Sequence, residues 1–217
     1  MSRMKTYILI LLSFVINSVA KAKVDVSRSL ASIQRVDHAR ELLGKRYKRS
    51  IVSTFEKHKG FEKNILETIS KRLPKKFKSQ AKLISDAIFK EAKVHSMDPY
   101  FVMAVISGES SFNPLAVGPV GEIGMMQIRP STGKWMAEKI NFKWKGDKTL
   151  RDPVANIKLG TAYLAWLRVK FDNHGQLYLA AYNMGAKSVR NSLEKHVWPK
   201  DYPLHVMKRY IAFYRAI

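Results

Sequence analysis

The feature that most constrains this fold is an apolar run that a helix at the protein surface could not carry. Residues Tyr100 to Ile106 are apolar at every position, so a helix formed by them has no polar side to turn toward water. Asp98-Pro99 directly precedes the run, and it places a capping aspartate before a proline suited to the first helical turn. The sequence therefore predicts a helix that starts at residue 99 and passes through a core.

Helical patterns continue on both sides of this run. Before it, apolar side chains recur at helical spacing over residues 83–92. After it, Asp152-Pro153 repeats the aspartate–proline start of a helix, which we expect to last to about Phe171. Further helices are predicted over residues 177–182, 186–195 and 205–214.

Between the central helix and Asp152, glycine and proline gather in one stretch. Residues 113–131 contain Pro114, Gly118, Pro119, Gly121, Gly124 and Pro130, a composition typical of a loop. The expected fold class is therefore all-α, reaching α+β at most through a small hairpin in this loop.

The N-terminus has the order of a secretory signal peptide. Arg3 and Lys5 precede an apolar run from Tyr7 to Ile16, and small residues follow at Ser18-Val19-Ala20. The run is short for a bilayer span. We therefore expect residues 1–20 to be a cleaved signal that exports the chain, with an uncleaved anchor as the alternative. Without a cysteine, a lipoprotein anchor is excluded.

Residues 21–77 are rich in Lys and Arg. Their apolar residues share helical faces in short pieces, and Gly60 and Pro74 interrupt them. We expect a basic extension that is helical or partly disordered and mainly solvated, with a dedicated wall-binding element as the alternative. A compact domain is predicted over residues 78–217.

Charge and composition limit the chemistry. Lys and Arg outnumber Asp and Glu by 39 to 17, giving a formal net charge of +22. This charge predicts an anionic partner, and nucleic acid, anionic lipid and a cell wall with peptide carboxylates all qualify. The chain has no cysteine, and its six histidines show no metal-ligand spacing, so neither a metal nor another cofactor is expected. Export argues against nucleic acid.

Glu109 is the candidate catalytic residue. On the central helix, Phe101, Val102, Val105 and Ile106 lie one or two turns before it on the same side. Apolar neighbours disfavour an ionised carboxylate and raise its pKa, which suits a general acid at neutral pH. The small residues Gly108 and Ser110 leave room beside it. Taken alone, a solvated surface carboxylate would remain the simpler interpretation.

The residues around Glu109 form part of a longer series of motifs. In order and spacing, this series resembles the soluble lytic transglycosylase family. The matching residues are Glu109-Ser110, Phe112-Asn113-Pro114, Ala116, Gly121, Gly124 to Gln127, Asp152-Pro153, Asn156-Ile157, Gly160, Tyr163-Leu164, Ala181-Tyr182-Asn183, Gly185, Tyr202, Val206 and Tyr210. Together they cover about residues 80 to 212.

The resemblance implies a lysozyme-like helical fold, similar to that of goose-type lysozymes, with a groove for peptidoglycan glycan strands. It implies that Glu109 protonates the oxygen between N-acetylmuramic acid and N-acetylglucosamine. Glu109 then takes a proton from the muramoyl C6 hydroxyl, which closes onto C1 to leave a 1,6-anhydro end. Residues 78–217 would be the catalytic domain of a periplasmic or secreted enzyme that does not insert stably into the membrane after signal cleavage. Cell-envelope machinery is a further possible partner.

The resemblance also assigns roles around the acid. Ser110, Met126, Gln127, Tyr182, Asn183 and Tyr202 are expected to bind substrate or line the groove. Tyr182 would hydrogen-bond near Glu109 and fix its rotamer, with a buried structural role as the alternative. Met125 is expected in the core. Among the four tryptophans, Trp166 is expected in the core, and the others could stack on sugars.

Three positions depart from the family pattern. Gly118 stands where the family often has serine, Glu122 where alanine is common, and Trp198 near the usual place of an acidic residue. Glu122 keeps a hydrolytic muramidase open as an alternative, since a second carboxylate could activate water. The simpler interpretation pairs Glu122 with solvent or with Arg129. A non-catalytic protein that binds or assembles the cell wall is the remaining alternative.

Overall fold

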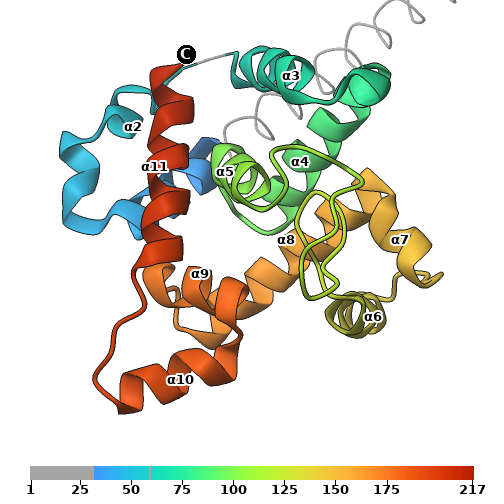
Figure 1. The fold of residues 1–217 in the computed structure, drawn as a ribbon. Coiled ribbons are helices and arrows are strands. Elements are labelled where there is room, and N and C mark those ends of the chain that lie inside the picture. Colours follow the sequence, from blue (N-terminus) through green and yellow to red (C-terminus); the bar gives the residue numbers. More distant parts are fainter. Residues whose placement is uncertain (1–31, 59) are drawn as a thin grey trace, which may run out of the picture.

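The computed structural model describes residues 32–58 and 60–217, and almost all of its regular structure is helical (Figure 1). Residues 32–43 are helical at the start of the described chain. The elements that follow are η1 (Gly44–Arg49), α2 (Ile51–Thr54), α3 (Phe61–Arg72), η2 (Lys75–Gln80), α4 (Ala81–Val94), α5 (Pro99–Glu109), α6 (Pro130–Lys139), α7 (Asp147–Arg151), α8 (Pro153–Lys170), α9 (Gly175–Met184), α10 (Ala186–Glu194) and α11 (Asp201–Arg215).

The predicted central helix is α5, and it forms for the reasons its sequence suggests. The Asp98 carboxylate accepts a hydrogen bond from the Tyr100 amide at 2.9 Å, and Pro99 occupies the first turn. Every residue from Pro99 to Ile106 is buried. The expectation of a helix enclosed by a core is confirmed.

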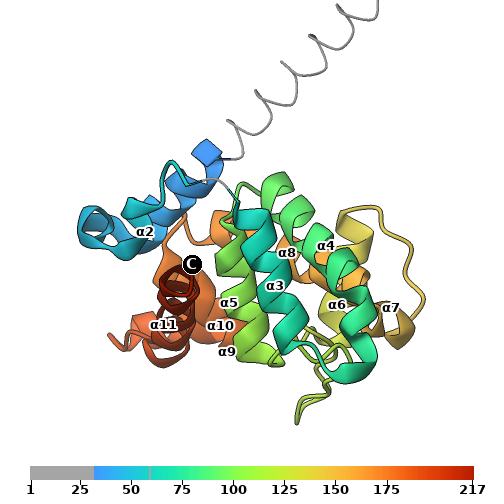
Figure 2. The same cartoon turned by 90° about the horizontal axis from the view of Figure 1, so that it is seen from above.

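Other helices surround α5 (Figures 1 and 2). Helix α11 packs along one side of it, and α3 and α4 lie on the other side. Helix α8 packs against α4, and α9 packs against both α8 and α11. The Asp152 side chain caps α8 by accepting from the Ala155 amide at 2.8 Å, with Pro153 in the first turn. Helix α5 thus lies between α11 on one side and α3 and α4 on the other.

The loop after α5 contains no extended strand. Among the described residues, its ladder contacts are isolated antiparallel bridges that join Val117 to Ile123 and Ile123 to Ile128. Gly124 has a φ of +83°, and a Cβ there would lie 2.3 Å from the Asn156 amide nitrogen. Only glycine fits this position, because both the backbone conformation and the space forbid a side chain.

The basic extension was expected to be mainly solvated, but several of its apolar side chains lie in the core. Val36, Ile65 and Ile69 are buried in the same core that contains α5. Arg35 is 4% exposed and donates a hydrogen bond to the Tyr214 hydroxyl on α11 at 2.9 Å. The apolar faces of these short helices are covered because α5 and α11 leave apolar surface for them to cover. The division at residue 78 stays a prediction, since one core spans both sides of it.

Some helices were not expected from the sequence. Helices α6 and α7 lie where no helix was predicted, and α11 begins four residues earlier than the predicted 205. This earlier start places Tyr202 in the first turn of α11. No helix in residues 32–58 or 60–217 is long and apolar enough to cross a membrane. The predicted signal peptide lies outside the described residues.

Candidate active site

Glu109 ends α5, and Tyr202 from α11 reaches across to it. The Tyr202 hydroxyl donates a short hydrogen bond to Oε1 of Glu109. Glu109 is the last helical residue of α5 and is partly buried. Two residues 93 positions apart in sequence are therefore brought together by the packing of α11 on α5.

The surroundings of Glu109 favour its protonated form. Burial raises its pKa above the ordinary value, and the negative charge of Glu122 acts in the same direction. The hydrogen bond from Tyr202 and the positive charge of Arg209 act against this rise, but the net shift is upward. A raised pKa is the direction that a general acid requires, because it keeps the proton on the carboxyl group to higher pH.

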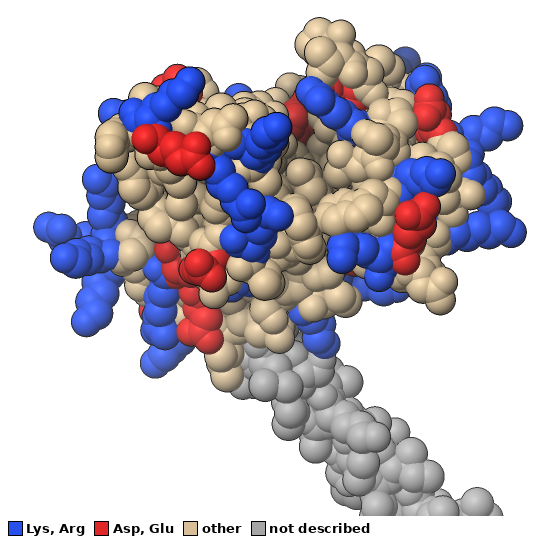
Figure 3. Space-filling view, turned by 90° about the horizontal axis from the view of Figure 1, so that it is seen from below, with Lys and Arg blue, Asp and Glu red and all other residues tan. Residues whose placement is uncertain are grey.

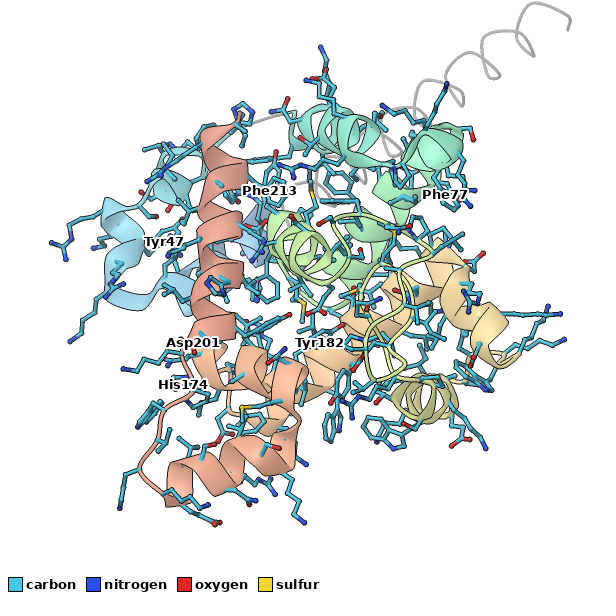
Figure 4. The ribbon with its side chains drawn as sticks, in the orientation of Figure 1. Tyr47, Phe77, His174, Tyr182, Asp201 and Phe213 are labelled. Carbon is cyan, nitrogen blue, oxygen red and sulfur yellow. The ribbon has the colours of Figure 1, made fainter. Side chains whose placement is uncertain are left out.

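Tyr182 was expected to hydrogen-bond near Glu109 and fix its rotamer, but its hydroxyl does not bond Glu109 itself. Its hydroxyl donates to the backbone carbonyl of Met126 at 2.7 Å. Figure 4 shows the position of Tyr182 near the middle of the molecule. The geometry assigns the contact with the acid to Tyr202 instead. Tyr182 holds the loop that faces the acid.

Met126 is fully buried, so its side chain is not exposed to a ligand. Its amide donates to Oδ1 of Asn156 at 2.8 Å. The Asn156 amide group donates in turn to the carbonyls of Ile123 and Leu150 at 2.8 and 2.9 Å. Asn156 is itself fully buried on α8. One side chain thus fixes three backbone groups of the loop region and sets where residue 126 lies.

Ser110 and Gln127 also hold this loop. The Ser110 hydroxyl donates to the Met125 carbonyl at 2.8 Å. The Gln127 side-chain amide donates to the carbonyls of Ala116 and Gly124 at 3.1 and 2.9 Å. Gln127 has a φ of +46°, an uncommon conformation for a side-chain-bearing residue. Met125 is fully buried, as expected. Substrate binding by Ser110, Met126 and Gln127 stays a prediction.

A cavity of about 480 Å³ lies next to Tyr202, between α9, α10 and the start of α11. Asn183, which is exposed, and Trp198 also line it. The space-filling view from below shows a hollow in the molecule with Lys and Arg side chains on both sides of it (Figure 3). The size is within the range of small-molecule sites. Asn183 and Tyr202 are therefore placed where a ligand could reach them.

The tryptophans divide between core and surface. Trp135 and Trp166 stack edge to face with their ring centres 4.8 Å apart, and both pack against the core with Trp144. Trp198 is 47% exposed beside the cavity. It is the tryptophan here whose ring is most open to a ligand.

Sequence reasoning overlooked two residues of the site. Asn156 was noted only as part of a motif, although three buried hydrogen bonds to the backbone depend on it. Arg209 was not noted at all. It lies seven residues after Tyr202, or about two turns along α11, and therefore on the same side of the helix. That spacing could have shown that its charge faces the same acid.

The fold and site define a class. A buried helix that ends in a partly desolvated glutamate, a glycine-rich loop beside it and helices around both are the lysozyme-like arrangement. The family model of the transglycosylase SLT domain matches residues 86–204. The chain belongs to this family.

Individual relatives agree with this assignment. The soluble lytic murein transglycosylase of Salmonella typhimurium is 36% identical over 94 residues, which cover 43% of this chain and 15% of that protein. The membrane-bound lytic murein transglycosylase E of Buchnera aphidicola is 34% identical over 100 residues, 45% of each chain. The chain thus spans a small part of the first relative and less than half of the second.

A solved structure supports the fold directly. The lytic transglycosylase Slt of Pseudomonas aeruginosa superimposes with a TM-score of 0.54 at 30% identity, covering 59% of this chain and 23% of that one. That protein was crystallised as an inactive glutamate-to-glutamine mutant. The expected helical, lysozyme-like fold is confirmed.

Proposed function

We propose that this protein is a peptidoglycan lytic transglycosylase that cleaves the β-1,4 bond between N-acetylmuramic acid and N-acetylglucosamine. The observation that carries the proposal is the Glu109 carboxyl group, which is raised in pKa by burial and held by the Tyr202 hydroxyl at the end of α5. Glycosidic oxygens leave only when protonated, and a neutral carboxylic acid supplies that proton.

In the proposed reaction, Glu109 gives its proton to the glycosidic oxygen as the bond from that oxygen to C1 of the muramoyl sugar breaks. The Glu109 carboxylate then takes the proton of the C6 hydroxyl, whose oxygen forms a new bond to C1. Protons and bonds balance within the substrate, and Glu109 ends as it began. One carboxyl group thus acts as acid and then as base, so no second carboxylate is required.

The remaining site residues receive proposed roles. Tyr202 orients the Glu109 carboxyl group, and together with Asn183 it borders the cavity in which sugars would lie. The side chains of Tyr182, Gln127 and Ser110 hold the loop after α5 in place beside Glu109, through hydrogen bonds to its backbone carbonyls. Met126 contributes through its backbone, because its side chain is fully buried. These residues bind substrate mainly by shaping the groove.

The names of the relatives support the same reaction, since each is called a lytic murein transglycosylase. That a glutamate-to-glutamine change inactivates the Pseudomonas relative fits a mechanism that depends on one glutamate. We further propose that residues 1–20 direct export to the periplasm or cell wall. Fractionation of cells that produce the full chain, with and without these residues, tests this part.

The mass of the reaction products tests the function. We expect purified peptidoglycan digested with this protein to release muropeptides with 1,6-anhydro ends, each lighter by one water than the product of hydrolysis. Reducing ends would instead support a hydrolytic muramidase that uses Glu122. If the sacculi are bound but not cleaved, the protein is a non-catalytic cell-wall-binding or assembly protein and the proposal is wrong.

A further inference from the structure

The Glu122 carboxylate is fixed in one place in the loop that follows α5. Its Oε1 accepts from Nε of Arg129 at 3.1 Å, and its Oε2 accepts from the Val120 amide at 3.2 Å. The Glu122 side chain is 18% exposed, so it is neither free in solvent nor sealed in the core. Two hydrogen-bond donors near this loop thus define the direction of the carboxylate.

Gly118 leaves the space into which this carboxylate fits. A Cβ on residue 118 would lie 2.4 Å from Oε2 of Glu122 and 2.7 Å from Oε1 of Gln127. Both distances are shorter than van der Waals contact, so a side chain at 118 and the present position of Glu122 exclude one another. The two departures from the family pattern at 118 and 122 are therefore one linked feature.

We propose that Glu122 is a positioning residue of the active site, because its carboxylate fills the place of a side chain on residue 118 and presents a fixed negative charge to Glu109. The inference rests on the proposed function, since it concerns the acid of that reaction. It assigns to Glu122 neither contact with the substrate nor activation of water.

The charges around the two carboxyl groups support this role. Burial works against the ionised form of Glu122, but hydrogen bonds from its own amide, Arg129 and Val120 outweigh burial and lower its pKa. The pKa values of the two carboxyl groups are thus shifted in opposite directions, which favours an ionised Glu122 beside a protonated Glu109. Like charge then favours the protonated form of Glu109.

Other groups face Glu109 from the surrounding helices. Tyr202 and Arg209 on α11 favour the ionised form of Glu109, and Tyr182 on α9 interacts with its charge. Glu122 is the nearby charge that acts in the opposite direction. Removing the negative charge of Glu122 should therefore lower the pKa of Glu109.

The first experiment measures the proton on Glu109 directly. In protein with carbon-13-labelled glutamate, the Glu109 carboxyl resonance is assigned as the signal lost in Glu109→Gln and is then titrated by NMR. In Glu122→Gln, which keeps the shape but removes the charge, we expect the Glu109 pKa to fall by about half a unit. The limb of the pH–activity profile on which the acid loses its proton should move to lower pH by the same amount.

The second experiment tests the link with Gly118. Gly118→Ala should displace the Glu122 carboxylate, seen as a change in the Val120 amide shift, and should lower the Glu109 pKa in the wild-type background. In the Glu122→Gln background the same change should have little further effect on that pKa. Val117→Ala is the control for loop perturbation, because the Val117 side chain lies in the same loop and is 60% exposed.

A Glu109 pKa that is unchanged in Glu122→Gln would overturn the inference. Equal pKa effects of Gly118→Ala in both backgrounds would also overturn it. The NMR titration does not depend on turnover, so it stands even if no peptidoglycan is cleaved. Conversely, anhydro products with an unshifted Glu109 pKa would leave the proposed function intact and remove the role of Glu122.

Discussion

At the scale of single residues, Tyr202 has two opposing effects on the acid. Its hydroxyl stabilises the ionised form of Glu109, so it lowers a pKa that burial raises. It also holds the carboxyl group in one orientation, and a small misplacement of a catalytic group costs much of the rate. Tyr202 therefore makes the rise in the Glu109 pKa smaller, but it also keeps the Glu109 carboxyl group in one orientation.

Tyr202→Phe separates these two effects. We expect the turnover rate to fall about tenfold, while the limb at which Glu109 loses its proton moves to higher pH. The pH dependence of muropeptide release measures both. Tyr47→Phe is the matched control, because the Tyr47 hydroxyl makes a similar bond to Glu56 at 2.7 Å in the N-terminal segment. A limb that moves to lower pH would contradict the proposed hydrogen-bond role.

Asn156 is the residue on which the loop depends most. In Asn156→Ala, the Met126 amide and the carbonyls of Ile123 and Leu150 lose their partner inside the core. Buried polar groups left without a hydrogen bond are costly, so we expect a loss of about 3 kcal/mol in the free energy of unfolding. Urea denaturation measures this loss.

Asn191→Ala provides the control for that measurement, since Asn191 is exposed on α10. We expect its effect to stay within about 0.5 kcal/mol. Similar losses for the two variants would mean that the buried network contributes little.

At the scale of elements, the helix over residues 32–43 is joined to the start of α5 by a buried histidine. Nδ1 of His38 accepts from the Asp98 amide at 3.0 Å. Its Nε2 therefore carries the proton and donates to the Tyr178 hydroxyl at 3.1 Å. Asp98 also accepts from Tyr210 and Tyr214 on α11 at 2.7 and 2.6 Å. The N-terminal segment, α5 and α11 thus meet in one polar cluster.

This cluster makes stability depend on pH. Burial, followed by the charge of Arg168, holds the pKa of His38 well below its ordinary value. The unfolded chain therefore takes up a proton below about pH 6.5 that the folded chain refuses. Stability contributed by neutral His38 is complete above that pH and is lost as the pH falls. We expect His38 by itself to contribute a loss of about 2 kcal/mol between pH 7 and pH 5.

Denaturation of His38→Gln at the two pH values tests this origin. The variant should be less stable at pH 7, and its stability should change less between pH 7 and pH 5. The pKa of His95 is also lowered, but it contributes equally to both proteins and cancels in the comparison. An unchanged slope in His38→Gln would place the pH dependence elsewhere.

The elements also show what the sequence could and could not predict. Helices α5 and α8 were predictable because each begins with an aspartate–proline pair and carries an apolar pattern. Helices α6 and α7 are short and partly polar, so their pattern was not distinctive. Glu109 was found through its apolar helix and its motif.

The partners of these residues were harder to predict. Periodicity shows which side of a helix is apolar but not which helix will cover it. The bond from Arg35 to Tyr214 spans 179 positions and has no local signal. For the same reason, the sequence does not show that a side chain on residue 118 would collide with the Glu122 carboxylate, because this depends on how the loop folds.

At the scale of the whole molecule, positive charge covers much of the surface around the compact helical domain. The formal net charge is +22, and Lys and Arg flank the hollow in Figure 3. Such a field attracts an anionic polymer and is weakened by salt. Within the short helix η1, four basic residues are exposed: Lys45, Arg46, Lys48 and Arg49.

We therefore expect binding to isolated sacculi to weaken as salt rises. Co-sedimentation of the Glu109→Gln variant with purified peptidoglycan, at low and at high sodium chloride, measures binding without cleavage. Replacing the four basic residues of η1 with glutamine should reduce the fraction bound at low salt. Binding that is equal at both salt concentrations would show that surface charge does not hold this protein on the wall.

The most direct test of the whole account is the rate of peptidoglycan cleavage by Glu109→Gln. This change keeps the size of the side chain but removes the transferable proton. We expect release of anhydro-muropeptides to fall about 1,000-fold or more, with an unchanged circular dichroism spectrum. Glu138→Gln, an exposed change on α6, should retain the full rate. Cleavage by a folded Glu109→Gln protein at a rate close to that of the wild type would contradict the account.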